Sequence, residues 1–491
     1  MAGRPRARRA PASALLLAPA LLLADGHAQR QYPWPTGRGR AQPGHYGVSP
    51  HRAPRELSSK TLAWKWSTPE GRFSTTFNGG ALIDDELSIY TASVDAIYKL
   101  SSAGRLVWKV VVHTSTIPVI DGGILYSSSK SGQMFALNMT TGTDIWVKQI
   151  SERIGSDIAS TGIRDGIVLT STHSLVGEGD SRVTALNATS GEFLWDFPTD
   201  SQLWNFMPIF TDDGSFVFQD QIGGVYHLKL RNGEVLWKAG YKGGWDETWN
   251  DGVLMLGANG MVYAVHSTTK PPCDPHDPGD ITAYRLSNGE VVWRQNTPYP
   301  PNSQPLVARL GEGPGLSVVL PIGMPASPPP VMRVFSWPLH TALQLALLHL
   351  SVFLGEWQSI LWRLQPHKSV VKVYDADTGD IQATWEAPVL KKGFPEGDDE
   401  GMLPRHAQGS QPLCIPNLWA SPSLDADGRI FLAHADGHVY VLRNDDGDDR
   451  FAGGSEVSSY YTGAAFGHPG PSIAPGMFAI VNCDTVYVFK D

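Results

Sequence analysis

Short runs of alternating hydrophobic and polar residues recur along this chain, and turns rich in Gly, Asn and Asp separate them. Alternation with a period of two predicts β-strands. A second pattern follows many of these runs, in which a glycine stands four residues before a tryptophan. Glycine permits the left-handed conformation that a tight turn between two strands needs. The pattern occurs at Gly104–Trp108, Gly142–Trp146, Gly191–Trp195, Gly233–Trp237 and Gly289–Trp293, and in a stretched form at Gly379–Trp385.

The spacing of these patterns predicts an all-β fold built from repeats. Each repeat supplies a four-stranded antiparallel blade, and residues 59–491 supply eight blades of one β-propeller. The run 475–491 provides only inner strands, whereas residues 61–66 provide an outermost strand with a tryptophan. Pairing these two ends closes the ring and protects the sheet edges. We expect the core between blades to hold Trp108, Trp146, Trp195, Trp237, Trp293 and Trp385.

The strings Ala136–Trp146 and Ala185–Trp195 resemble the PQQ-like repeat of the quinoprotein alcohol dehydrogenase-like superfamily. The resemblance covers about residues 60–490 and implies an eight-bladed propeller. This superfamily contains both enzymes and non-catalytic scaffolds. Its enzymes hold a quinone beneath a bridge between two adjacent cysteines and use calcium, but this chain has no adjacent cysteine pair. It is therefore more similar to the scaffold members, and a PQQ-dependent oxidoreductase with a degenerate cofactor site is the alternative.

The N-terminus has the pattern of a secretory signal peptide over residues 1–28. Four arginines precede an apolar run at 14–24, which ends near a small-x-small site at 26–28. An organellar transit peptide is the alternative, because the segment is Arg-rich and poor in acidic residues. Export would place the protein in the secretory pathway, secreted or lumenal. Residues 29–58 are rich in Pro, Gly and Arg, and we expect a flexible linker there.

Charge and cysteine content restrict the possible partners and crosslinks. The net charge is −9, which argues against a nucleic-acid partner because such proteins present a basic surface. Three cysteines allow at most one disulfide. Cys273 and Cys414 lie in Pro-rich stretches and could form it, whereas Cys483 lies in an apolar strand-like run and is expected to be a buried, inert thiol.

The longest connections are predicted to open on one face of the propeller. Residues 173–181, 268–280 and 323–369 separate second and third strands, and residues 386–421 join two blades. In a four-stranded meander these two kinds of connection share a face, and long loops on a rigid scaffold often bind ligands. Two glycosylation sequons, at Asn138 and Asn187, lie in third-to-fourth turns on the opposite face. Their sugars would leave the face with the long loops clear.

Aromatic and polar residues recur where the chain enters an innermost strand. We predict a ligand site there, which takes a protein or glycan partner. The alternative is that its tryptophans pack between blades. No catalytic residue is assigned, and no metal site, because the acidic stretches 425–428 and 444–449 lack the spacing of an EF-hand. The predicted ligand-binding residues are Trp204, Asn205, Asp246, Glu247, Trp249, Asn250 and Trp419.

The segment 331–364 does not fit the repeat. It contains no Asp, Glu, Lys or Arg between Arg333 and Glu356, and that stretch is long enough to span a bilayer. Three interpretations stay open: a membrane anchor, an amphipathic helix that docks on the propeller or a partner, or sequence foreign to the mature protein. An anchor would put the two halves of the propeller on opposite sides of a membrane. Membrane association is therefore not expected except through this segment.

Overall fold

The repeated glycine and tryptophan build the outer half of each blade. In the computed structural model the turn glycines have φ between 69° and 78°, the left-handed region that disfavours other residues. Just after this turn the outermost strand carries a bulge, as at the register shift between Ala185 and Leu186, which face Trp195 and Phe193. A bulge changes which side of the strand a residue faces. The tryptophan is thereby directed towards the neighbouring blade.

The structure describes most of the repeat region and parts of the segment before it. The described residues are 31–40, 45–114, 116–152, 159–172, 181–203, 205–240, 250, 253–267, 277–310, 315–323, 368–390, 404–405, 408, 418–445, 451 and 454–491. The predicted signal peptide lies outside them.

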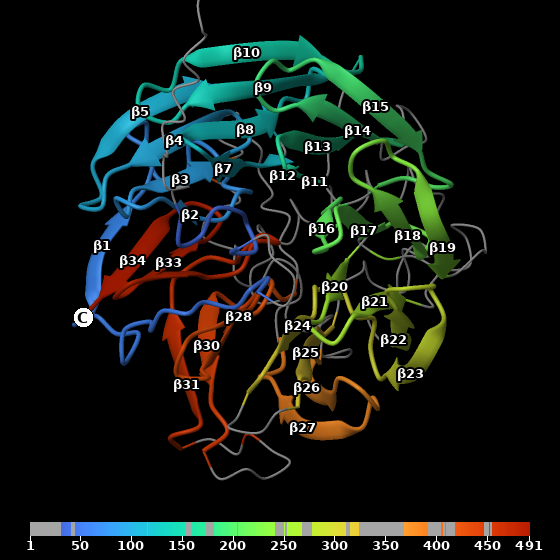
Figure 1. The fold of residues 1–491 in the computed structure, drawn as a ribbon. Coiled ribbons are helices and arrows are strands. Elements are labelled where there is room, and N and C mark those ends of the chain that lie inside the picture. The colour runs from blue at the N-terminus through green and yellow to red at the C-terminus, as the bar shows by residue number, and fades with distance from the viewer. Residues whose placement is uncertain are drawn as a thin grey trace, which may run out of the picture.

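The strands form eight antiparallel four-stranded sheets arranged as a ring, which confirms the predicted propeller (Figure 1). Blades 1 and 2 are β2 (Leu82–Ile83), β3 (Ile89–Ala92), β4 (Ala96–Leu100), β5 (Leu106–Val111), and β7 (Val119–Asp121), β8 (Ile124–Ser128), β9 (Gln133–Asn138), β10 (Asp144–Gln149). Blades 3 and 4 are β12 (Gly162–Arg164), β13 (Ile167–Thr172), β14 (Arg182–Asn187), β15 (Phe193–Pro198), and β16 (Ile209–Phe210), β17 (Ser215–Gln219), β18 (Gly224–Lys229), β19 (Val235–Gly240).

The second half of the ring follows the same order, from the innermost strand outwards. Blades 5 and 6 are β20 (Leu254–Leu256), β21 (Met261–Ser267), β22 (Gly279–Arg285), β23 (Val291–Thr297), and β24 (Leu306–Ala308), β25 (Ser317–Ile322), β26 (Val370–Asp375), β27 (Ile381–Glu386). Blades 7 and 8 are β28 (Ser423–Leu424), β29 (Ile430–Ala433), β30 (His438–Leu442), β31 (Val457–Tyr461), and β32 (Ser472–Ala474), β33 (Met477–Val481), β34 (Val486–Lys490), β1 (Leu62–Trp66). Between blades 2 and 3, β6 (Thr116–Ile117) and β11 (Ala159–Ser160) form a short parallel pair.

Each blade tryptophan joins its blade to the next one. Trp195 of blade 3 donates its indole N–H to the carbonyl of Leu230 in blade 4, at 3.0 Å, and its ring lies against Gly233 of the same turn. A Cβ added at Gly233 would approach the Trp195 ring to 2.7 Å. The glycine and the tryptophan of successive repeats are therefore in direct contact. The same indole bond is made by Trp108, Trp146, Trp237 and Trp293.

The ring closes through the N-terminal and C-terminal strands, as predicted. β1 pairs antiparallel with β34 and becomes the outermost strand of blade 8. Figure 1 shows β1, in blue, beside β34, in red. Trp64 of β1 donates to the carbonyl of Ser102 in blade 1 at 3.1 Å and packs on Gly104. The closing strand therefore reproduces the link that the other blades make.

The segment before β1 is not a flexible linker, and the prediction for residues 29–58 is wrong for its described part. Residues 31–40 and 45–55, here called the N-terminal plug, run across the innermost strands. Trp34 is 1% exposed and pairs with Ile83 at the end of β2. Tyr46 accepts a hydrogen bond from the amide of Phe210 at 2.7 Å, and Val48 pairs with Leu424.

The plug closes one end of the central channel. Its contacts lie at the far ends of the innermost strands, beside the first-to-second turns. There Arg429 binds the plug directly: its guanidinium donates to Asp425 and to the carbonyls of Ala53, Pro54 and Arg55. We call this the plain face. In Figure 1 the blue chain before β1 runs from the rim towards the centre, past β28.

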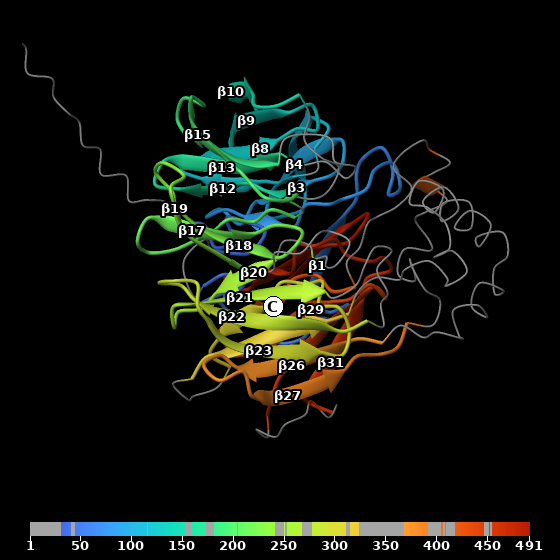
Figure 2. The same ribbon diagram turned by 90° about the vertical axis from the view of Figure 1, so that its right-hand side faces the viewer.

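The long connections open on the other face, here called the loop face. β13 and β14, β21 and β22, and β25 and β26 are second and third strands of their blades, so the long stretches between them fall where they were predicted. The side view in Figure 2 shows the blades stacked around the axis that joins the two faces. No helix in the described part of the chain is long and apolar enough to cross a membrane. The segment 331–364 lies outside the described residues.

Replacing residues 324–368 by a two-residue Asn-Gly turn is expected to leave a cooperatively folding propeller. The pairing of β25 with β26 continues to Ile322 and Val370, and a Cβ on Gly323 would lie 2.9 Å from the Ser369 Cβ. The two ends of the stretch are therefore close enough for a hairpin turn. A single melting transition within a few degrees of the full chain is the expected result. Loss of that transition would show that the stretch supplies part of the core.

Candidate functional site

One position of the repeat surrounds the channel at the loop face. Four residues before an innermost strand begins, the described blades carry a polar or aromatic side chain. In blades 2 and 3 this position lies outside the described residues. We call the six others the mouth ring, and they are Asn78, Asn205, Asn250, Asn302, Trp419 and His468.

The mouth ring is tied together by hydrogen bonds between blades. The amide nitrogen of Asn78 donates to the carbonyl of Thr114, and that of Asn250 donates to the carbonyl of Gln221 at 2.9 Å. Ser421 donates to the carbonyl of His468 at 3.0 Å. Because these bonds join neighbouring connections, they hold Asn78, Asn250 and His468 in place.

Asn205 is the member with the least satisfied side chain. It is 5% exposed, and neither its amide nitrogen nor its amide oxygen has a hydrogen-bond partner. Its backbone has φ of 47°, a left-handed conformation that costs energy for most residues but that asparagine tolerates. A buried amide without partners costs about 1–3 kcal/mol, so it points to a water or ligand that satisfies it in solution.

Further buried polar atoms without partners lie in and near the inner strands. Gln304, before the innermost strand of blade 6, donates to the sulfur of Met207, before that of blade 4, and its amide oxygen has no partner. Such atoms also occur on Asn78, Ser160, Thr161, Ser171 and Gln219. All of these side chains are uncharged. The hydroxyl groups can both donate and accept a hydrogen bond, whereas the amide oxygens only accept one. The loop-face end of the channel is thus polar.

The second-to-third turns of blades 4 and 7 carry acidic side chains at this end. Asp220 accepts bonds from the hydroxyl of Tyr226 at 2.7 Å and from the amides of Ile222 and Gly224. Burial nevertheless raises the pKa of Asp220 to about 6, because desolvation outweighs these bonds. In blade 7, His434 and His438 both lie against Asp436, and these contacts lower the pKa of Asp436.

Ser369, His434 and Asp436 have the residue types of a hydrolytic triad. Ser369 Oγ lies 3.3 Å from His434 Nε2, and His434 Nδ1 lies 3.1 Å from Asp436 Oδ1. His434 is 1% exposed and Ser369 is 4% exposed, so the hydroxyl has no access to a substrate. The amide of Asp436 also donates to Nδ1, which favours the tautomer opposite to that of a catalytic base. We conclude that Ser369, His434 and Asp436 hold blades 6 and 7 together.

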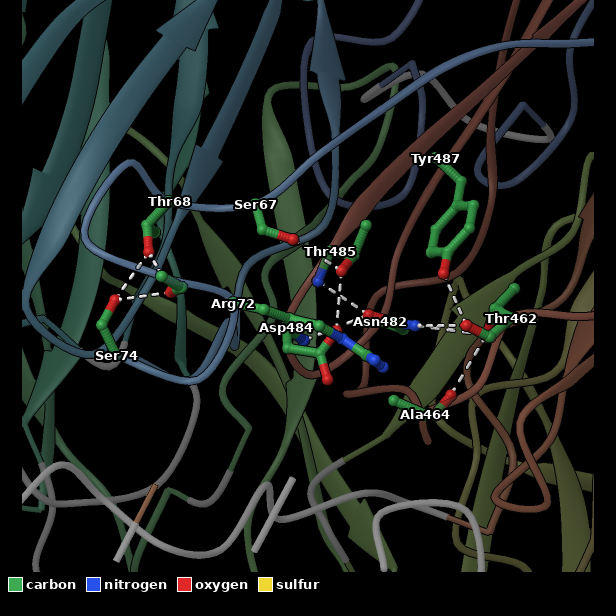
Figure 3. Close-up of polar contacts among 11 residues, drawn as sticks. Ser67, Thr68, Arg72, Ser74, Thr462, Ala464, Asn482, Asp484, Thr485 and Tyr487 are labelled. Carbon is green, nitrogen blue, oxygen red and sulfur yellow. Dashed lines mark hydrogen bonds and ion pairs between the residues drawn. The ribbon is translucent and has the colours of Figure 1, made fainter. Parts of the chain in front are cut away.

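A polar cluster stands at the loop face where the ring closes (Figure 3). Arg72, in the connection after β1, pairs with Asp484 in the turn between β33 and β34 at 2.9 Å. Asp484 also accepts from the hydroxyl of Thr485, and Ser67 bonds to the same hydroxyl. Figure 3 shows the hydroxyl of Tyr487 bonded to the carbonyl of Thr462, in the connection between β31 and β32. These bonds link the first and last strands and support the closure.

The predicted ligand residues are only partly gathered at the mouth. Asn205 and Asn250 lie there, as expected from their place before an innermost strand. Trp419 is buried at 1% exposure, and its ring packs at a tilt against His434, with ring centres 4.2 Å apart, and against Trp385, at 6.0 Å. It packs between blades, which was the alternative interpretation. The others, Trp204, Asp246, Glu247 and Trp249, lie outside the described residues.

Sequence reasoning missed three members of the mouth ring. Asn78, Asn302 and His468 occupy the same place as Asn205 but lack the preceding tryptophan that drew attention to 204–205 and 249–250. The signal that could have found them is the fixed offset from the following innermost strand. His468 is 5% exposed, and burial together with the charge of Arg38 lowers its pKa to about 3.

The cysteine prediction is corrected by the structure. Cys483 is fully buried, as expected, but it is disulfide-bonded and not a free thiol. Its partner lies outside the described residues. Three cysteines form at most one disulfide, so the predicted bridge between Cys273 and Cys414 is excluded here. Cys483 belongs to the turn 482–485 at the loop face, where a bridge constrains a connection and not a strand.

The blade-core tryptophans and the sequon asparagines lie in their predicted structural places. Trp146, Trp195, Trp237, Trp293 and Trp385 are 7–9% exposed, and Trp108 is partly buried. Asn138 and Asn187 are half-buried in third-to-fourth turns on the plain face. Each side-chain oxygen accepts amides of the next turn residues, which is ordinary turn chemistry. Their glycosylation stays a prediction.

Outside the mouth, a cavity of about 580 Å³ opens at the rim between blades 2 and 3. It is lined by residues such as Lys148, Phe193 and the ion pair of Arg182 with Asp196 at 2.9 Å. Among the described residues, no group of three or more His, Cys, Asp or Glu is arranged to hold a metal ion.

Comparison with known proteins supports the PQQ-like repeat. Residues 92–269 match the family model described as outer membrane protein assembly factor BamB. The BamB of Nitrosomonas eutropha is 25% identical over 268 residues, which cover 44% of this chain and 62% of that protein. The chain covers less than two thirds of the length of the curated relatives that it matches.

Solved structures share the fold at low sequence identity. BamB from Moraxella catarrhalis superposes with a TM-score of 0.55 at 14% identity, covering 88% of this chain and 99% of that one. Quinohemoprotein alcohol dehydrogenase from Comamonas testosteroni gives a TM-score of 0.57 at 12% identity, covering 93% and 80%. The predicted PQQ-like repeat propeller is therefore confirmed as a fold, and this fold occurs in both an assembly factor and an enzyme.

Proposed function

We propose that this chain is a non-catalytic binding scaffold that engages a partner protein at its loop face. The observation that carries the proposal is Asn205, a buried amide without hydrogen-bond partners in the mouth ring. A site that presents fixed donors and acceptors binds a group that completes them. The plug closes the opposite end of the channel, so the loop face is the end left for binding.

The relatives favour a protein partner over a glycan. The curated relatives and one structural neighbour are named as assembly factors, a function that depends on contacts with other proteins. Export to the secretory pathway fits this proposal. Sugars on Asn138 and Asn187 would then cover the plain face and leave the loop face free. PQQ with calcium remains the alternative ligand, and the experiment below includes it.

Asn205→Gly is expected to weaken partner binding by about tenfold or more, the usual effect of removing one buried polar contact. Glycine removes the amide and still adopts the positive φ at this position. Asp212→Asn is the matched control, because Asp212 is 83% exposed in the first-to-second turn of the same blade, on the plain face. Binding is measured by quantitative affinity capture from the secretory fraction of the source cells, with the chain from Gln29 as bait.

The result supports the proposal if one set of proteins is retained by the unchanged chain and by Asp212→Asn and is lost with Asn205→Gly. An identical set with all three baits would contradict it. Saturable binding of PQQ in the presence of calcium, measured by calorimetric titration, would also overturn the non-catalytic assignment and favour the enzyme.

A further inference from the structure

A buried arginine without a counter-charge lies in the N-terminal plug. Arg38 is 5% exposed, and neither Nε nor Nη1 of its guanidinium has a hydrogen-bond partner. No carboxylate of the described residues forms an ion pair with it. A guanidinium stays charged in proteins, and a buried charge without a partner is among the most costly arrangements in a folded chain.

Another buried arginine of the same chain shows what a satisfied guanidinium looks like. Arg429 is 9% exposed and binds Asp425 through Nε and Nη2, while three carbonyls of the plug take its remaining donors. The two arginines are buried to a similar extent. Arg38 differs because its protein partners are missing, not because it is more exposed to water.

The backbone around Arg38 is fixed, so the direction in which its side chain leaves the chain is fixed too. Thr36 and Gly39 pair with each other, and Thr36 Oγ1 accepts the amide of Arg38 at 3.0 Å. The carbonyl of Arg38 accepts the amide of Gly47 at 2.7 Å. Gly39 has φ of 75° and packs against the ring of Trp34. The turn 36–39 therefore holds Arg38 inside the channel.

The surroundings of Arg38 are neutral or positive. Burial and the positive charge of Arg38 both lower the pKa of His468, a member of the mouth ring. The imidazole of His468 is therefore uncharged. Burial also lowers the pKa of Arg38 itself. Gly37, the residue before Arg38, lies beside Ile117 and Pro469, which are apolar. These groups can donate hydrogen bonds or exclude water, but they cannot neutralise the guanidinium.

We propose that Arg38 is an anion-binding residue and that the channel holds one small oxyanion, a carboxylate or a phosphate, against its guanidinium. Oxyanions match the planar array of N–H donors that a guanidinium presents. The site is distinct from the Asn205 amide that carries the proposed partner binding, although His468 belongs to the same mouth ring. Anion binding does not require a partner protein. Bound anion would also link the plug to the ring, since Arg38 belongs to the plug and His468 to blade 8.

The test compares melting of the chain from Gln29 in three buffers of equal ionic strength: sodium chloride, sodium phosphate and sodium acetate. The variants are Arg38→Met, Arg38→Gln and the control Arg52→Gln. Arg52 is in the same plug, but its side chain is 77% exposed and pairs with Asp427. All proteins are dialysed to equilibrium before measurement. The phosphate and acetate arms separate the two kinds of oxyanion.

Phosphate or acetate is expected to raise the Tm of the unchanged chain and of Arg52→Gln by about 2 °C or more relative to chloride. Arg38→Met and Arg38→Gln are expected to lose this shift and to melt in chloride at or above the Tm of the unchanged chain, because a costly buried charge is gone. Equal shifts in all four proteins, or no shift in the unchanged chain, would overturn the proposal. A Tm of the Arg38 variants in chloride well below that of the unchanged chain would also overturn the proposal. It would show that the protein itself satisfies the charge of Arg38.

Discussion

Trp195→Ala is expected to lower the free energy of unfolding by about 3–5 kcal/mol, the range for truncating a large aromatic side chain in a core. The substitution removes the indole bond to Leu230 and leaves a cavity against Gly233. It also removes the stacking of Trp195 on Phe216, whose ring centre lies 6.2 Å away. Denaturant unfolding followed by circular dichroism measures the change.

Phe193→Ala is the matched control for this prediction. Phe193 lies on the same strand, two residues earlier, but its side chain is 62% exposed on the outer edge of the blade. Truncating it removes little buried surface, so a change within about 0.5 kcal/mol is expected. Equal losses for both variants would show that the blade tryptophans do not carry the packing between blades.

Removing the N-terminal plug is expected to destabilise the propeller at least as strongly. A chain that begins at Ser59 loses Trp34 and Tyr46, exposes the edges of innermost strands such as β2 and β28, and leaves Arg429 without its three carbonyl partners. Loss of one buried tryptophan alone costs about 3–5 kcal/mol. We expect the Tm to fall by about 10 °C relative to the chain from Gln29.

A synthetic peptide of residues 31–58 serves as the control for this truncation. If the plug acts through its contacts, the added peptide binds the shortened propeller and restores part of the lost Tm in proportion to its concentration. A shortened chain that melts like the longer one would contradict the role given to the plug. A low Tm that the peptide cannot raise would indicate damage to β1.

The blades could be predicted because the forces that form them are local and repeated. A left-handed glycine, a bulge and a tryptophan occupy a short stretch, as in 191–195, and every blade needs the same contact with its neighbour. Even the closing strand carried its own signal, since Trp64 lies in an alternating run before β2. Because the same sequence signal recurs in several blades, the fold could be predicted from several independent stretches of the chain.

The plug and the disulfide could not be predicted in this way, because each depends on contacts distant in sequence. Residues 31–58 have the composition of a linker, yet their aromatic residues Tyr32, Trp34 and Tyr46 are buried. Cys483 was correctly predicted to be buried, but it was expected in a strand-like run as a free thiol, whereas it lies in the turn 482–485 and is disulfide-bonded. The pairing of a cysteine depends on which loop reaches it. The mouth ring was found only where a tryptophan marked it.

The pairing of β1 with β34 has a consequence for synthesis. The ribosome releases β1 near the start of translation and β34 only at residues 486–490, so blade 8 cannot form until nearly the whole repeat region has emerged. Until then β1 has no partner strand, and the face of blade 1 that packs against blade 8 stays uncovered. Contacts that span such a separation form slowly, and open edges invite aggregation. We therefore expect the unfinished ring to need chaperones during translation, and the finished one to unfold from this seam.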